Sequence, residues 1–102
     1  MAAYSLSAKA AADLDGIYEY TILQFGLEQA RAYLVGLHER FEMLAEQPDL
    51  GRNVEELAPD LRRSEYRLHV VFYLPKTGGV RIVRVLHEGM DVKRHLRLSP
   101  ES

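Results

Sequence analysis

The sequence predicts a single α+β domain with the element order β-α-α-β-β-β, in which an N-terminal αα-hairpin packs on one face of a small, mainly antiparallel sheet. Three observations lead to this prediction. Residues 8–25 and 27–46 repeat apolar residues at three- and four-residue steps, which is the helical period. Residues 61–87 are rich in β-branched and aromatic residues, which favour strands. A chain of 102 residues is long enough for one core, so residues 1–102 are expected to form one domain.

The first half of the chain contains a short strand and two helices. Residues 3–7 predict the strand, and Ser7 is placed to cap the first helix because its hydroxyl can accept from a free amide of the first turn. Gly26 ends that helix, and Pro48 follows the second. Two helices joined so tightly must run antiparallel. The predicted apolar stripes are Ala11, Leu14, Ile17, Tyr18, Thr21, Ile22 and Phe25, then Ala30, Tyr33, Leu34, Leu37, Phe41, Leu44 and Ala45, with Lys9, Asp13, Asp15 and Glu19 exposed to solvent.

The second half predicts three strands. Residues 47–60 form an ordered connector that Leu50, Val54 and Leu57 attach to the core. Strands at 61–67, 68–74 and 80–87 follow, and the last two are joined by a turn at 75–79 whose glycines supply positive φ. Asp91 is placed to cap a short C-terminal helical turn through residues 93–95.

The strand at 80–87 is largely apolar on both faces. Strict alternation places Val80, Ile82, Arg84 and Leu86 on one face, and Arg81, Val83, Val85 and His87 on the other. Such a strand is expected at the centre of the sheet with cover on each side. Because the hairpin can cover only one face, the hypothesis is that a partner protein covers the other, helped by the C-terminal turn.

Composition excludes several classes of site. The chain has no cysteine, so disulfides and thiolate metal sites are excluded. No apolar run approaches the roughly 20 residues of a membrane span, and the N-terminus lacks an apolar secretion segment, so a cytoplasmic protein with no membrane partner is expected. A Gly-rich phosphate loop, a His-Glu-x-x-His pair and a nucleophile elbow are all missing, and no cofactor or metal is predicted.

The formal charge of −2 hides an asymmetry between the two halves. Residues 1–60 hold four basic and eleven acidic residues, a net charge of −7, whereas residues 61–102 hold nine basic and four acidic residues, a net charge of +5. This segregation indicates a basic face for an acidic partner. The alternative is that the two halves attract each other within the fold.

A set of short motifs, in order along nearly the whole chain, resembles the ParE toxin family of the RelE/ParE superfamily of type II toxin-antitoxin systems. The motifs are Tyr4-Ser5-Leu6-Ser7, Asp13-Leu14, Phe25-Gly26, Gln29-Ala30, Pro48-Asp49-Leu50-Gly51-Arg52, Leu61-Arg62-Arg63, His69-Val70-Val71-Phe72-Tyr73, Arg84-Val85-Leu86-His87, Met90-Asp91 and Arg94-His95-Leu96. Each piece alone means little; their order carries the resemblance.

The resemblance implies a bacterial toxin that inhibits DNA gyrase by protein-protein binding and is not an enzyme. It also implies a ParD-like antitoxin whose C-terminal region folds onto the toxin, as a hetero-oligomer, and which alone contacts operator DNA. An acidic, amphipathic segment that orders on binding would suit an apolar surface with a basic rim.

The alternative function is that of the RelE-like, ribosome-dependent mRNA endonucleases. Cleavage by an activated 2′-hydroxyl needs a base, a cation near the scissile phosphate and an acid for the leaving oxygen. Arg62, Arg63, Arg84 and His87 could supply some of these roles. Glu88, next to His87, would repel a phosphate, which favours the gyrase inhibitor.

The predicted antitoxin- or target-binding residues lie on the last three strands and the closing turn: Arg62, Arg63, His69, Arg84, His87, Met90 and Arg94. Arg62 and Arg63 are adjacent in a strand, so they point to opposite faces and only one can belong to a given patch. Two structural alternatives remain open. Arg84 could be a buried arginine held by Glu65 or Asp91, and His87 could be a structural hydrogen-bonding histidine.

Overall fold

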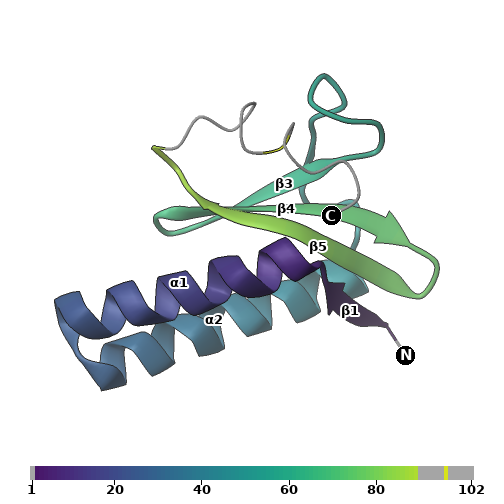
Figure 1. The fold of residues 1–102 in the computed structure, drawn as a ribbon. Coiled ribbons are helices and arrows are strands. Elements are labelled where there is room, and N and C mark those ends of the chain that lie inside the picture. The colour runs from purple at the N-terminus through teal and green to yellow at the C-terminus, as the bar shows by residue number, and fades with distance from the viewer. Residues whose placement is uncertain (1, 90–95, 97–102) are drawn as a thin grey trace.

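The computed structural model describes residues 2–89 and Leu96. Seven elements follow one another along this part of the chain, and the predicted α+β fold is confirmed (Figure 1). They are β1 (Ala3–Leu6), α1 (Ala8–Phe25), α2 (Leu27–Glu46), β2 (Arg52–Asn53), β3 (Arg62–Tyr66), β4 (His69–Lys76) and β5 (Gly79–His87). The two-residue strand β2, inside the predicted connector, is the one element among these that the sequence did not predict.

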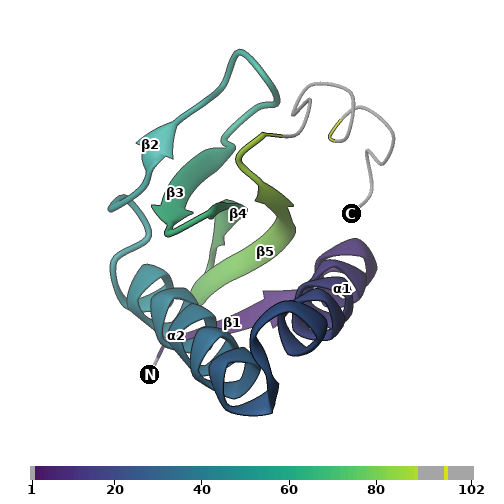
Figure 2. The same ribbon diagram turned by 90° about the vertical axis from the view of Figure 1, so that its left-hand side faces the viewer.

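The helical hairpin begins and ends where its sequence signals predict. The Ser7 hydroxyl accepts a hydrogen bond from the amide of Ala10 at 2.9 Å, which confirms the cap. Gly26, at φ 94°, ends α1 and begins α2. The two helices lie side by side under one face of the sheet (Figures 1 and 2). Ala11 and Phe25, both predicted on the apolar stripe, are exposed. Ala11 lies to one side of the buried line of Ala10, Ile17 and Thr21, and Phe25 is the last residue of α1, at the turn of the hairpin.

The five strands form one mixed sheet in the order β1-β5-β4-β3-β2. The strand predicted to be central, β5, lies between β1, to which it is parallel, and β4, to which it is antiparallel. The remaining pairs are antiparallel. The prediction that β5 lies inside the sheet, with a strand on each side, is therefore confirmed. Because β1 pairs with the first half of β5, that half is hydrogen-bonded along both edges.

The first core lies between the hairpin and the sheet. Its buried residues come from both helices and from β4 and β5: Ala10, Ile17, Leu37, Phe41, Leu44, Ala45, Val71, Tyr73, Val80, Ile82 and Val85. Tyr4 and Leu6 of β1 pack against the same cluster. Most of the stability of these two amphipathic helices comes from this packing.

The face of the sheet away from the helices carries a second core, which corrects the hypothesis of an open face. Val54, Leu61, Val70, Phe72, Val83 and Leu86 are buried there, with Leu57, Ala58, Leu74 and Leu96 packed against them. The chain itself covers this face, since the connector after α2 folds back across it through Val54 and Leu61. Leu50, predicted to attach the connector, is instead 49% exposed.

A β-bulge in β5 overturns the predicted assignment of faces. Phe72 pairs with Arg84 and Tyr73 pairs with Ile82, so Val83 is an extra residue opposite β4. Alternation therefore shifts by one at this point: Val80, Ile82 and Val85 share the helix-facing core, and Val83 and Leu86 share the other. One inserted residue reverses the faces of all that follow.

The predicted closing turn, with Met90 and Arg94, lies outside the described residues except for Leu96. Within residues 2–89 and Leu96, neither helix is long and apolar enough to span a membrane.

Candidate partner-binding surface

The five predicted binding residues that the structure describes do not form one surface. Arg62 donates from Nη1 to the carbonyl oxygens of Asp49 at 3.3 Å and Gly51 at 2.5 Å. It therefore holds the segment that connects α2 to β2. Its register partner, Tyr73, belongs to the core under the helices and donates to the carbonyl of Pro48 in the same segment.

Arg63 lies on the other side of β3. Its guanidinium is 5.6 Å from the ring centroid of Phe72, which belongs to the second core. Nε and Nη2 bind the carboxylate of Glu65 at 3.0 and 2.9 Å. The prediction that Arg62 and Arg63 face opposite ways is confirmed by these separate surroundings.

Arg84 is bound by Asp13 of α1 in a two-pronged ion pair. Nε and Nη2 donate to the two carboxylate oxygens at 2.8 and 2.9 Å, and the side chains are only 12% and 14% exposed. The hydrogen bond from Arg84 to Asp13 raises the pKa of Arg84 above its ordinary value. The structural alternative for Arg84 is thus the observed one, but with Asp13 as the carboxylate. The prediction that Asp13 is solvated was wrong.

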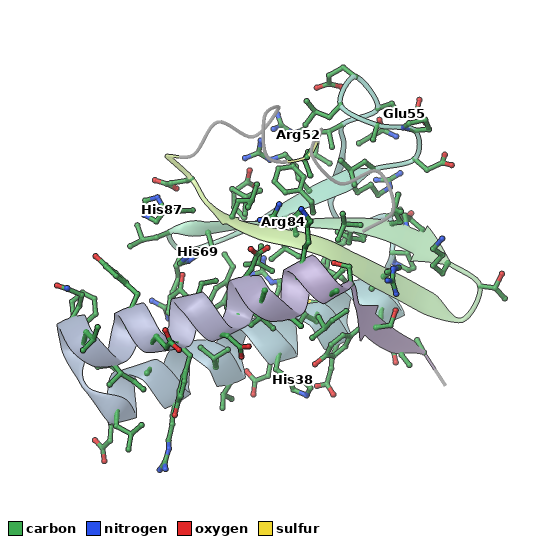
Figure 3. All side chains as sticks on the ribbon, viewed as in Figure 1. His38, Arg52, Glu55, His69, Arg84 and His87 are labelled. Atoms are coloured by element: carbon green, nitrogen blue, oxygen red, sulfur yellow. The ribbon has the colours of Figure 1, made fainter. Side chains whose placement is uncertain are left out.

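His69 and His87 face each other across β4 and β5 at the end of the sheet (Figure 3). Their ring centroids are 5.6 Å apart and the rings are nearly perpendicular. His69 is half-buried against Tyr33 of α2, whose hydroxyl is 2.7 Å from Nδ1. His87 is exposed, and its Nδ1 accepts from the amide of Gly89 at 3.2 Å. Two of the predicted residues are therefore brought together here.

Burial lowers the pKa of His69 below its ordinary value, and the nearby charge of His87 lowers it further. His69 is consequently neutral at pH 7. One tautomer satisfies every contact: Nδ1–H donates to the Tyr33 hydroxyl, which donates in turn to the carbonyl of Tyr66 at 3.3 Å. The bond to Tyr33 fixes the orientation of this imidazole, and its lowered pKa makes it a weaker base than a free histidine.

The turn of the hairpin exposes a group of large apolar side chains. Tyr20, Leu23, Phe25 and Leu27, here called the hairpin tip, are 62%, 82%, 64% and 46% exposed. The tip extends past the end of the sheet in Figure 1, so the sheet cannot cover it. Exposed apolar groups gathered at one place mark protein interaction sites more often than other surfaces.

Three residues that organise the surface were missed at the level of sequence. Asp13 binds Arg84, Tyr33 holds His69, and Arg40 of α2 donates to Ser64 Oγ at 2.9 Å and to the carbonyl of Glu65 at 2.6 Å. A signal existed for Asp13. It is three residues after Ala10 and four before Ile17, both buried, so it lies on the same side of the helix.

Contact with a phosphate would require the predicted arginines to give up their present bonds. Each of the three predicted arginines in the described strands is held by a carbonyl or carboxylate of its own chain. A cation that stabilises a phosphate must reach it, and these would first have to leave their partners.

Comparison with known proteins gives a consistent family. The family model described as "ParE toxin of type II toxin-antitoxin system, parDE" matches residues 4–92. The chain is 43% identical to Toxin ParE1 of Caulobacter vibrioides over 94% of its length and 99% of that protein. It is 39% identical to Toxin ParE of Escherichia coli, with 94% of each chain covered. Toxin ParE1 of Mycobacterium tuberculosis is 37% identical over 91% of this chain and 96% of its own.

A solved structure described as a chromosomal ParDE toxin-antitoxin system from P. aeruginosa shares the fold. Its TM-score is 0.72 at 24% identity, covering 85% of this chain and 96% of that one. The family is shown by the sequence relatives, because this chain matches almost the full length of each. In agreement with its ordered motifs and its helical hairpin on a mixed sheet, the chain belongs to the ParE toxin family of type II toxin-antitoxin systems.

Proposed function

We propose that this toxin inhibits DNA gyrase by protein-protein contact and is neutralised by a ParD-like antitoxin. The observation that carries the proposal is the near full-length similarity to three bacterial ParE toxins. A ParDE system pairs a toxin with an antitoxin, so a protein partner is expected, and operator DNA is reached only through that partner. A gyrase-directed toxin acts in the cytoplasm, where gyrase is.

The internal bonding of the arginines shifts the proposed contact surface. Arg62, Arg63 and Arg84 are engaged within the fold, whereas His87 and the hairpin tip are exposed. We therefore assign partner contact to the hairpin tip and to His87, and we keep Met90 and Arg94 as predicted contact residues. Apolar anchors surrounded by polar groups are the usual centre of a protein interface.

One sample divided between two assays tests the function. The purified toxin is added to gyrase supercoiling reactions and, separately, to translation reactions in which mRNA cleavage is followed. The proposal expects inhibited supercoiling with intact messages, and removal of the inhibition by the antitoxin encoded beside the toxin. Cut messages with normal supercoiling would instead select the RelE-like endonuclease and refute the proposal.

A pair of matched variants tests the surface. Leu23→Ser changes the hairpin tip, and Val35→Ser changes an apolar residue of α2 that is also exposed, at 56%. Leu23→Ser is expected to weaken antitoxin or gyrase binding by at least about tenfold, a loss of about 1.4 kcal/mol, while Val35→Ser binds normally. Equal binding by both variants would remove the hairpin tip from the interface.

A further inference from the structure

A cleft of about 450 Å³ lies at the edge of the sheet, where β2 ends and β3 continues alone. It is separate from the hairpin tip and from the His69–His87 pair. Its lining comes from α2, the connector and β3: Arg40, Leu50, Gly51, Arg52, Arg63, Ser64 and Glu65. Three arginines and one glutamate therefore line this space.

Two of these arginines are forced together by the strand register. Arg52 of β2 and Arg63 of β3 are direct cross-strand partners, so their side chains leave the same face of the sheet. Like charges in this arrangement repel each other and destabilise the pair. Figure 3 shows Arg52 on the side of the sheet away from the helices.

Glu65 compensates only part of this charge. Its carboxylate binds Arg63, and the Arg40 guanidinium is fixed by Ser64 and by the Glu65 carbonyl. In the described part of the chain, by contrast, the Arg52 side chain forms no hydrogen bond or ion pair. Since Arg63 is already bonded to Glu65, the pair is stabilised by an anion that binds the Arg52 guanidinium.

We infer that this cleft binds carboxylate side chains of an acidic segment in another polypeptide. Arginine donates two parallel hydrogen bonds to a carboxylate. Leu50, which lines the cleft and is 49% exposed, offers an apolar contact to the stem of an acidic side chain. Nucleic acid fits less well. Among the described residues, none with an aromatic ring lines the cleft for base stacking, and the chain carries a net charge of −2. The inference goes beyond the proposed function, because it assigns a ligand class to a cleft of whose lining residues only Arg63 belongs to the predicted site.

The test uses the whole chain and a short fluorescent peptide of alternating Asp and Ser, beside a control peptide of alternating Asn and Ser. The acidic peptide is expected to bind, with an affinity that falls as salt is added, and the Asn peptide is not. Arg52→Glu and Arg52→Gln should each weaken binding at least about tenfold. Because Arg52 is exposed, both variants should remain folded, which circular dichroism checks.

Arg31→Glu is the matched control, since Arg31 is an exposed arginine of α2 that does not line the cleft. It makes the same change in net charge as Arg52→Glu and should bind the acidic peptide normally. Three results would overturn the inference: no binding of the acidic peptide, equal loss in the Arg31 and Arg52 variants, or binding of a single-stranded oligonucleotide but not the peptide. Neither antitoxin nor gyrase is in the assay, so its failure is distinct from failure of the proposed function.

Discussion

Asp13 ties the first helix to the central strand through Arg84. One carboxylate oxygen accepts from Arg84 Nη2, and the other accepts both from Arg84 Nε and from the backbone amide of Val85, at 2.8 and 2.9 Å respectively. This contact lies beyond Leu6, where β1 no longer pairs with β5. The Asp13 side chain of α1 thus takes the place of β1 as the hydrogen-bond acceptor for this part of β5. It also joins the acidic first half of the chain to the basic second half.

Removal of either partner is therefore expected to destabilise the fold. Asp13→Ala or Arg84→Ala should each lower the free energy of unfolding by about 3 kcal/mol, because each leaves a largely buried charge without its partner. Urea unfolding of the two single variants and the double variant measures their coupling. If the effects of the single changes simply add, the ion pair contributes nothing of its own.

Ser7 performs two tasks with one hydroxyl. Its oxygen accepts from Ala10 at the start of α1, and its hydrogen is donated to the carbonyl of Val83, the bulged residue, at 2.7 Å. Ser7→Ala should cost about 2 kcal/mol or more, since it removes both a cap and a buried donor. Ser5→Ala, at an exposed position of β1, should change the urea midpoint very little. Similar midpoints for the two variants would show that the buried hydroxyl is dispensable.

Gly79 is required by its closeness to β1. A Cβ atom at this position would lie 1.7 Å from the carbonyl oxygen of Ala3, its register partner. Gly79→Ala should therefore separate β1 from β5 and lower stability by more than about 2 kcal/mol. Gly78→Ala provides the control. Its φ is also positive, at 81°, but no atom is near, so only the backbone cost of about 1–2 kcal/mol applies. Thermal or urea unfolding that ranks Gly78→Ala as the worse variant would contradict this account.

His69 should make stability depend on pH. Its pKa is lowered in the folded state, so the unfolded chain binds a proton more readily. Stability is then complete above the ordinary pKa of about 6.5 and falls as the pH decreases below it. A His69→Gln variant should lose less stability than the wild type between neutral and mildly acidic pH.

The contact between His69 and His87 predicts a change in the His69 pKa that NMR can follow. His87→Gln removes a neighbouring charge that lowers the His69 pKa, so the His69 titration should move upward in this variant. A His69 midpoint at or above its ordinary value in the wild type would refute the role of burial.

The sequence by itself determined the order of the main elements, the bounds of both helices and the central place of β5. These depend on local signals: the Ser7 cap, the Gly26 break and the apolar run from Val80, each of which acts within a few residues. The tertiary structure alone decided the cover of the second face, the bulge at Val83 and the partners of the arginines. Those depend on where distant segments meet, as when Asp13 reaches Arg84, and no local period in the chain encodes such a meeting.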